Sequence, residues 1–391
     1  MSRRRSIVLL GPHPALCERA RRAGLGVIVV DTPGRLLPGV IAGADHVIAT
    51  DYTDTRRTAA LLSVLGEDTE IVGVLSLTEP GLVPVARINA LLGLPDNPVD
   101  VVERVKDKDL MRRWLADDPR FSLPAALVRG ADDLAVFLAD HGAPAVVKPH
   151  DGAGSVGVRL VRGKDEAGEL AYPLLAEKYV EGREFSVESL SADGVHTILG
   201  ITEKSLFEGG FVERGHTFPA PLTGDDEALL RGFVRDFLTR VGLRHGLAHT
   251  EVILTADGPV AVETHTRNGG DHITDLVQLA TGYDMLSAAV RAKADGAEGP
   301  AGQEVPAAAR TAVIRYLAAP AGTVREIHGT HAARYLPGVV DLQVTVGKGD
   351  VIRPVSSSLD RVGYVIAVGA DADEAVRHAR AALDTVELTV E

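Results

Sequence analysis

Two acidic residues lie inside an apolar hairpin pattern in the second half of the chain. Two apolar runs, residues 250–254 and 260–262, flank the turn Ala256-Asp257-Gly258, and this pattern predicts a β-hairpin. One strand carries Glu251 and the other carries Glu263. A buried carboxylate is costly unless it is paired or holds a metal, so two acids on adjacent strands are well placed to share divalent cations. Magnesium takes one or two protein carboxylates and completes its octahedron with water and phosphates.

The residues after the second strand extend this candidate site. Arg267 lies four residues beyond Glu263 and adds a fixed cation beside the acids. Gly269 and Gly270 then remove side chains where a ligand would need room. The alternative is a surface hairpin with two solvated acids. Other segments of the chain are needed to distinguish a metal site from such a hairpin.

Composition limits the class of protein. At 391 residues the chain predicts roughly two to four domains. A hydrophobic content of 45% with 24% charged residues describes a soluble globular protein, and the net charge of −13 argues against nucleic acid or an anionic membrane as the main partner. The single cysteine, Cys17, rules out an intrachain disulfide and a multi-cysteine metal site. No apolar run is long enough for a membrane span or a signal sequence, so we expect a cytoplasmic protein.

Lysine is used sparingly. Only eight of the 41 basic residues are lysines, and none precedes Lys106. Because arginine supplies nearly all the general surface charge, a lysine more often has a specific role. Four of the eight lie in stretches with other signs of chemistry: Lys108, Lys148, Lys178 and Lys204. We count Lys204, which follows a predicted strand, among the candidate catalytic residues.

Strands and helices alternate through the first hundred residues. This alternation predicts a parallel, doubly wound sheet. The turn after the first strand lacks the GxGxxG spacing of a dinucleotide fingerprint. Glu79 follows the apolar run 71–77 and would lie at a carboxyl-end loop, where ligands bind in such sheets. The alternative for Glu79 is an acid that stabilises a helix N-terminus.

A glycine-rich hairpin follows residue 148. Glycines at positions 152, 154 and 157 lie between two apolar strands, and no GK[ST] follows, so this is not a Walker A loop. Backbone N–H groups of such a loop can close over phosphates, and Lys148 at its entrance can contact the same anion. An ordinary glycine-rich hairpin is the alternative.

Three later segments complete the pattern. The pattern of residues 176–188 predicts extended chain, a turn at Gly182 and then an alternating strand. The extended backbone can offer N–H and C=O groups to the edge of an adenine, and Glu184 can accept ribose hydroxyls. A solvated acidic strand is the alternative. Residues 207–220 have no clean period and predict a long loop, which is more often functional than idle. Short strands and a closing helix predict a small C-terminal α+β domain.

Taken together, these stretches resemble the ATP-grasp superfamily across essentially the whole chain. The resemblance implies an N-terminal doubly wound domain, a two-part ATP-grasp region and a small C-terminal α+β domain like that of the biotin-carboxylase-like branch. We place the domains at residues 1–104 (N-terminal), 105–176 (subdomain A with the glycine-rich loop), 177–298 (subdomain B with the metal site) and 299–391 (C-terminal).

The resemblance also implies a role for each matching residue. Lys108 and Lys148 match the lysines that contact ATP phosphates, and residues 150–157, with Gly152, Gly154 and Ser155, match the loop that folds over them. The remaining matches are an adenine hinge at Glu177, Lys178 and Val180, a ribose contact at Glu184, and magnesium ligands at Glu251 and Glu263.

One position departs from the family pattern. The usual Glu-x-Asn-x-Arg becomes Glu263-Thr264-His265-Thr266-Arg267, so His265 replaces an Asn that helps to hold one magnesium. Histidine is a poor magnesium ligand, and His265 either bonds through water or favours Mn²⁺. The pairs His249-x-Glu251 and Glu263-x-His265 raise a transition-metal site as an alternative. Arg267 is intact, and in similar enzymes it steadies the transferred phosphoryl group and the anionic intermediate.

The implied reaction joins a carboxylate to an amine. The carboxylate attacks the γ-phosphate of ATP, and the amine then attacks the acyl phosphate to give an amide, ADP and phosphate. In the related carboxylases, Gln, Val and a Glu base follow the Arg, whereas this chain has Gly269, Gly270 and Asp271. We therefore expect an amino acid as substrate, with the carboxylase and a carrier-bound amine as alternatives.

Residues of the predicted loop are the candidates for substrate contacts. Arg214 can grip a carboxylate and Glu213 an ammonium, and an exposed loop of mixed charge is the alternative. His216, Asp271 and His272 are the candidate bases. Similar enzymes are often homodimers, so the resemblance also implies a homodimer.

Overall fold

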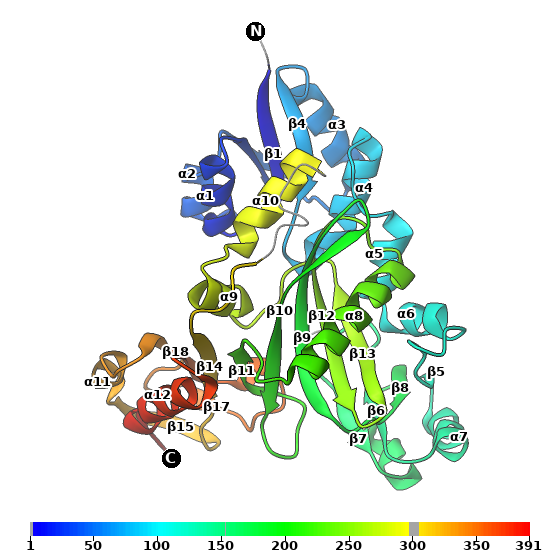
Figure 1. Ribbon diagram of the computed structural model, residues 1–391, viewed down its shortest axis with the longest axis vertical. Helices are drawn as coiled ribbons and strands as arrows, with labels where there is room; N and C mark the ends of the chain where they lie inside the picture. Colours follow the sequence, from blue (N-terminus) through cyan, green and yellow to red (C-terminus); the bar gives the residue numbers. More distant parts are fainter. Residues whose placement is uncertain (1–2, 153, 297–304) are drawn as a thin grey trace.

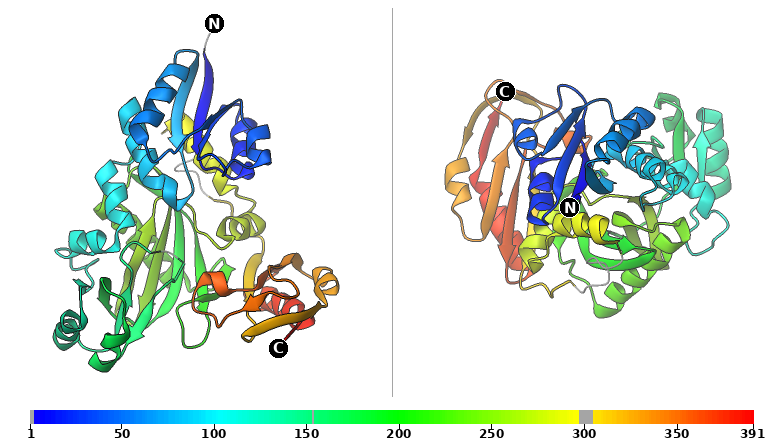
Figure 2. Two further views of the ribbon diagram at one scale, coloured as in Figure 1. Left: turned by 180° about the vertical axis from the view of Figure 1, so that it is seen from behind. Right: turned by 90° about the horizontal axis from the view of Figure 1, so that it is seen from above.

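The computed structural model describes residues 3–152, 154–296 and 305–391. An N-terminal region forms one end of the molecule (Figure 1). A large antiparallel sheet occupies the middle. The small sheet with β7 and the C-terminal region lie on opposite sides of its other end (Figures 1 and 2).

The N-terminal region contains a four-stranded parallel sheet in the order β3-β2-β1-β4. Apolar side chains along its strands point alternately to the two faces of the sheet, and both sets are buried. Helices therefore cover both faces. Val290, from a helix late in the chain, completes one of these layers. The predicted doubly wound sheet is confirmed. Its elements are β1 (Arg4–Leu10), α1 (Pro14–Arg22), β2 (Gly26–Asp31), α2 (Pro38–Ala42), β3 (His46–Ala49), α3 (Thr55–Leu65), β4 (Thr69–Leu75), the 3₁₀ helix η1 (Glu79–Gly81) and α4 (Leu82–Leu92).

Two short helices lead into a small antiparallel sheet. Asp107 ends α5 and caps α6, since its side chain accepts hydrogen bonds from the N–H groups of Asp109 and Leu110. The sheet that follows has the order β5-β8-β6-β7. Its elements are α5 (Val99–Lys106), α6 (Lys108–Leu115), β5 (Ala125–Val128), α7 (Ala131–His141), β6 (Ala145–Lys148), β7 (Arg159–Val161), η2 (Lys164–Glu169) and β8 (Leu174–Lys178).

The large sheet has eight strands in the order β13-β12-β9-β10-β11-β14-β18-β16. Phe185, Val187 and Ile201 on one face pack against α8. The opposite face is polar near Glu251 and apolar further along, where α9 and α10 cover it. The elements before the C-terminal region are β9 (Arg183–Ala192), β10 (Val195–Leu206), β11 (Glu213–Phe218), α8 (Gly224–Val241), β12 (Gly246–Thr255), β13 (Gly258–His265), α9 (Ile273–Thr281) and α10 (Met285–Asp295).

The C-terminal region shares the large sheet. Strands β14, β18 and β16 extend it beyond β11, α12 covers them, and β17-β15-β19 form a separate small sheet. The predicted mixed α/β and α+β architecture is confirmed. The elements are β14 (Thr311–Leu317), β15 (Gly322–His328), α11 (Thr330–Arg334), β16 (Val339–Val344), β17 (Val351–Ile352), η4 (Ser358–Asp360), β18 (Gly363–Gly369), α12 (Ala372–Thr385) and β19 (Glu387–Val390).

Two of the three predicted domain limits lie inside a helix or strand of the structure. Residue 104 lies inside α5 and residue 176 lies inside β8, whereas the limit at 298 and 299 lies outside the described residues. In residues 3–152, 154–296 and 305–391, no helix is long and apolar enough to cross a membrane.

The prediction of a loop over residues 207–220 was wrong for its second half. Residues from Glu213 onward form β11, which pairs with β10 on one side and β14 on the other. Arg214 is the extra residue of a bulge, because Leu206 pairs with Glu213 and Ser205 pairs with Gly215. A Cβ on Gly215 would lie 2.3 Å from the carbonyl oxygen of Ile314, so only glycine fits there. The bulge and the glycine together hide the strand alternation in the sequence.

Candidate functional site

Cross-strand pairing aligns the candidate residues in rows on one face of the large sheet. Residues that pair across neighbouring strands share a face, and residues two apart on one strand share it too. The rows are Glu263, Glu251, Ser186 and Thr202; then Glu184, Lys204 and His216; then His265, His249 and Glu188. The predicted metal ligands, ribose contact and catalytic lysine therefore lie in neighbouring rows.

Each acid of the hairpin is paired with a lysine. Lys204 Nζ lies 2.9 Å from Glu251 Oε2, and Lys108 Nζ lies 2.7 Å from Glu263 Oε2. Burial alone would raise the pKa of Glu251, but the Lys204 ammonium outweighs it and holds that pKa well below its usual range. For Glu263, His265 and Lys108 likewise overcome burial and lower the pKa. Both acids are ionised and directly opposite one another, which fits a divalent cation that takes further oxygens from phosphates.

His265 is a bridge between carboxylates rather than an open metal ligand. Its Nδ1 lies 2.8 Å from Glu79 Oε1, and its Nε2 lies 3.0 Å from Glu263 Oε1. Both ring nitrogens of His249 face carboxylates in the same way, those of Glu188 and Glu251. Within the described ranges, no cluster of three His, Cys, Asp or Glu residues could hold a metal. The geometry therefore gives no support to the transition-metal alternative.

A buried triad fixes Lys148. Glu177 lies between Lys148 Nζ, at 2.7 Å, and Arg112 Nε, at 2.6 Å, and its carboxylate is 5% exposed. Burial would raise the pKa of Glu177, but Arg112 and Lys148 lower it to about 2. The Glu177 carboxylate is engaged by Arg112 and Lys148, and the predicted contact of this segment's backbone with adenine stays a prediction. The side chain of Lys178 is exposed, its N–H donates to the carbonyl of Pro124 at 2.9 Å, and Val180 is partly buried.

The glycine-rich loop lies against two other segments. Gly154 and Ser155 have φ of 68° and 58°, left-handed values that suit glycine and strain serine. Ser155 Oγ donates to the carbonyl of Phe211 at 3.0 Å, and the carbonyl of Gly154 accepts from Ser358 N–H at 3.3 Å. The carbonyl of Gly152 accepts from Lys108 Nζ at 2.7 Å. Residue 153, within the predicted loop, lies outside the described residues.

Arg267 is held by an acid from the N-terminal region. Arg267 Nε donates to Glu79 Oε1 at 2.6 Å. Burial would raise the pKa of Glu79, but the neighbouring His265 and Arg267 lower it to about 2. Glu79 also begins η1, as the helix N-terminal alternative predicts, and its place at a ligand site stays a prediction.

A second network surrounds Asp271. The Arg361 guanidinium donates to both carboxylate oxygens of Asp271 at 2.7 Å, and His216 Nε2 lies 3.0 Å from one of them. Arg361 also lies over the ring of Tyr316, 3.5 Å from its centroid. Burial opposes ionisation, but His216 and Arg361 hold the pKa of Asp271 far below its usual range. His216 is buried in β11, which corrects the prediction that it lies in a loop.

Three family models match most of the chain. The model described as ATP-grasp N-terminal domain matches residues 17–96, ATP-grasp domain matches residues 170–275, and L-amino acid ligase C-terminal domain 2 matches residues 315–391. A protein of Sinorhizobium fredii (strain NBRC 101917 / NGR234) called "Uncharacterized protein y4rH" is 31% identical over 389 residues, which cover 95% of this chain and 80% of that one. The chain belongs to the ATP-grasp superfamily.

Two further similarities place this ATP-grasp chain among known proteins. Carnosine synthase 1 of Homo sapiens is 26% identical over 306 residues, which cover 70% of this chain. The chain spans only 37% of that protein's length. The crystal structure of an L-amino acid ligase from Bacillus licheniformis aligns over all of both chains with a TM-score of 0.83 and 22% identity, which shows a shared fold.

The two glycines after Arg267 differ in their surroundings in this ATP-grasp chain. A Cβ on Gly269 would lie 2.7 Å from His249 Nδ1, so protein atoms fill the space that the sequence suggested for a ligand. A Cβ on Gly270 would meet nothing within 4 Å. The prediction of open room is therefore wrong at Gly269, and the space beside Gly270 is open.

The remaining predicted site residues differ in burial and in whether other protein groups already engage them. Glu213 is engaged, since Lys204 Nζ lies 3.4 Å from its carboxylate and Ser358 Oγ donates to it at 3.1 Å. Arg214 is exposed on the bulge. Burial raises the pKa of Glu184, which is partly buried beside Lys204. The ring of His272 is bonded to Asp275, at 2.7 Å.

Sequence reasoning missed Arg112, Glu188 and Arg361. Arg112 had a signal, because a helix over its segment places it on one face with Lys108, Met111 and Leu115, all of which are buried. Glu188 alternates with Glu184 and Ser186 along β9, a polar pattern on a buried strand. Arg361 follows η4 in a stretch without a motif, and no local pattern points to it.

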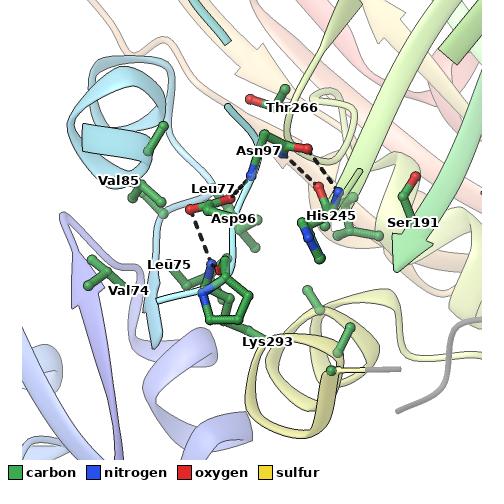
Figure 3. Close-up of a pocket in the computed structure, with 18 of the residues that line it drawn as sticks. Val74, Leu75, Leu77, Val85, Asp96, Asn97, Ser191, His245, Thr266 and Lys293 are labelled. Carbon is green, nitrogen blue, oxygen red and sulfur yellow. Dashed lines mark hydrogen bonds and ion pairs between the residues drawn. The ribbon is translucent and has the colours of Figure 1, made fainter. Parts of the chain in front are cut away.

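A separate cavity of about 320 Å³ lies between the N-terminal region and the start of β12 (Figure 3). Asp96, Asn97, His245 and Lys293 supply polar groups to its wall. Lys293 Nζ lies 3.1 Å from Asp96, so this pair is satisfied within the protein. None of the predicted site residues lines this cavity.

Proposed function

We propose that the protein is an ATP-dependent carboxylate–amine ligase that forms an amide bond through an acyl phosphate, with an amino acid as one substrate. The observation that carries this proposal is the grouping of Glu251 and Glu263 with two lysines on one face of the sheet, beside Arg267. The match of residues 315–391 to an L-amino acid ligase domain supports the amino acid.

The first step is phosphoryl transfer. A carboxylate oxygen of the acid substrate attacks the γ-phosphorus of ATP, the bond from that phosphorus to the β–γ bridging oxygen breaks, and ADP leaves. Such a step depends on positioning and on neutralising charge. Lys108 and Lys148 supply the cations, and Glu177 with Arg112 keeps Lys148 in place. Mg²⁺ held by Glu251 and Glu263 would neutralise phosphate charge there, and Mn²⁺ has the same donor preference.

The second step is acyl transfer. The amine nitrogen attacks the acyl carbon, the carbon–oxygen bond to phosphate breaks, and the amine loses a proton as the amide forms. Arg267 would supply the fixed cation that stabilises the developing oxyanion. Glu79 accepts from its Nε and the carbonyl of Asn268 accepts from its NH1, so the guanidinium is fixed in place. The contacts of Glu213 and Arg214 with substrate stay predictions.

A specific observation weighs against the carboxylase alternative. A carboxylase needs a base after the arginine to deprotonate bicarbonate, and Asp271 is the acid at hand. Arg361 and His216 occupy its carboxylate and lower its pKa far below the usual range, so Asp271 is a poor base. A free amine or a carrier-bound amine both fit the remaining geometry.

The proposed function is tested by phosphate release from MgATP with each of the twenty amino acids, singly and in pairs, and with bicarbonate separately. Release that requires an amino acid, with a product mass equal to the two partners minus water, supports the ligase. Release with bicarbonate alone moves the protein to the carboxylases. Hydroxylamine traps an activated acyl group even when the natural amine is absent, so hydroxamate without amide points to a carrier-bound amine. The cytoplasmic location and the homodimer stay predictions, and size-exclusion chromatography with light scattering tests the homodimer.

A further inference from the structure

We infer that Glu188 and His249 form a positioning pair that couples Glu251 to the turn after β13, which carries Arg267. What the coupling achieves rests on the proposed function: nucleotide bound at Glu251 would set the position of the arginine used in the next step. The link is a continuous series of contacts. Gly269 N–H donates to Glu188 Oε2 at 3.0 Å, Glu188 Oε1 lies 2.5 Å from His249 Nδ1, and His249 Nε2 lies 3.4 Å from Glu251 Oε1.

The pair is buried at its centre. Glu188 is 0% exposed and His249 is 5% exposed. A carboxylate so deeply buried is costly unless its oxygens are satisfied, and here each oxygen has a different partner. One oxygen holds the imidazole and the other holds the backbone of the turn. Movement of the imidazole is therefore transmitted to Gly269 through one rigid carboxylate.

Gly269 lets the turn approach this pair closely. A Cβ there would lie 2.7 Å from His249 Nδ1, which is too close for a side chain, and 3.0 Å from Glu188 Oε1. Arg267 belongs to the same turn, since its NH1 donates to the carbonyl of Asn268 at 2.6 Å. The position of the Arg267 backbone is thus tied to the pair over three consecutive residues.

The other end of the link lies at a residue that a ligand would engage. Glu251 is shared between His249 and Lys204, so a cation bound to Glu251 changes the partner of the imidazole. Groups that orient a metal-binding carboxylate typically change metal affinity 10- to 100-fold when mutated. A merely structural pair would change stability alone, whereas a coupling pair makes the turn respond to nucleotide.

The experiment measures backbone hydrogen exchange of the peptide covering residues 266–271, with and without saturating MgADP. Wild-type protein should show exchange slowed about tenfold by MgADP, because an ordered turn opens less often. Glu188→Gln and His249→Gln keep the approximate size of each side chain and remove its ionisable group. In both variants we expect MgADP to leave exchange of this peptide unchanged, although calorimetry shows the nucleotide site saturated.

Two further variants keep the test decisive. The double variant Glu188→Gln/His249→Gln replaces the buried ion pair with a neutral pair, which folds even where a single change leaves an unpaired charge. Glu203→Gln is the matched control, since Glu203 lies on the opposite face of the sheet and pairs with Arg183 at 2.7 Å. It should keep the wild-type response.

Either of two results overturns the inference. One is wild-type protein without a response to bound MgADP, and the other is a folded, saturated pair variant with the full wild-type response. Direct contact between nucleotide and turn would produce the second result. No amino acid is present in this experiment, so failure of the ligase assay leaves its outcome unaffected, and failure here leaves the ligase proposal standing.

Discussion

Replacing Arg112 with Met should destabilise the protein strongly. Arg112 is 2% exposed at its side chain and donates to Glu177 and to the carbonyls of Ala261 and Val262, at 2.6 to 2.9 Å. It joins α6 to the hairpin that carries Glu263. Methionine fills much of the same volume but leaves Glu177 with Lys148 as its remaining cation.

The expected loss is about 3 to 5 kcal/mol, the usual cost of removing one partner from a buried ion pair. The pKa of Glu177 gives a similar figure for the net effect of Arg112, Lys148 and burial together. Its ordinary pKa is 4.5 and its folded value is about 2, and at about 1.4 kcal/mol for each pH unit this difference corresponds to about 3 kcal/mol. Because the folded pKa is the lower one, this stability is fully present above pH 4.5 and is lost as the pH falls toward 2.

Urea unfolding followed by tryptophan fluorescence measures the loss. The chain has one tryptophan, Trp114, two residues from Arg112 on α6. Arg113→Met is the matched control, because Arg113 is 67% exposed and its ion pair with Asp109 joins residues of the same helix. The control should cost about 0.5 kcal/mol or less.

The difference between wild type and Arg112→Met should also shrink as the pH falls below 4.5. A loss no larger than that of the control at pH 7 would refute this account of the triad. A loss independent of pH would show that the backbone contacts of Arg112, and not Glu177, carry the effect.

Three further predictions follow from the other contacts. Glu79→Gln should lower kcat about 10- to 100-fold in the phosphate-release assay, because Arg267 loses its charged partner, and an unchanged kcat would contradict this. Arg361→Met should cost about 1 to 3 kcal/mol in thermal unfolding, since the partly buried Asp271 loses two charged hydrogen bonds, and an unchanged Tm would contradict this. Removing divalent cations with EDTA should weaken ADP binding at least about tenfold in calorimetry, and equal affinity with and without Mg²⁺ would argue against metal at the paired acids.

The fold was predictable where periodicity is local. Residues 55–65 and 82–92 are helices of the alternating pattern predicted for the first hundred residues, because their apolar spacing follows the helical period. The hairpin acids were predictable for the same reason, since both lie in one short segment with a clear turn. Strand β11 was missed because the bulge at Arg214 shifts its alternation by one residue.

Partners distant in the chain were not predictable. Arg112 and Glu177 are 65 residues apart, and Arg361 and Asp271 are 90 residues apart. Each pair forms only when separate elements pack, and nothing in the sequence near one residue specifies the other. The same limit explains the error at Gly269, where the sequence suggested room for a ligand and the fold supplies His249 from another strand.

The dependence of nucleotide binding on metal follows from how the polar face is neutralised. Lys108, Lys148 and Lys204 each lie within 2.9 Å of a carboxylate, so each buried cation already has an acid partner. Phosphates alone would draw lysines away from Glu251 and Glu263 and leave buried acids uncompensated, at a cost of several kcal/mol. A divalent cation that arrives with the phosphates replaces the lysines on those acids, and every charge keeps a partner. ADP without metal must therefore bind more weakly than MgADP, and the size of the difference measures how fully the two hairpin acids depend on their lysines.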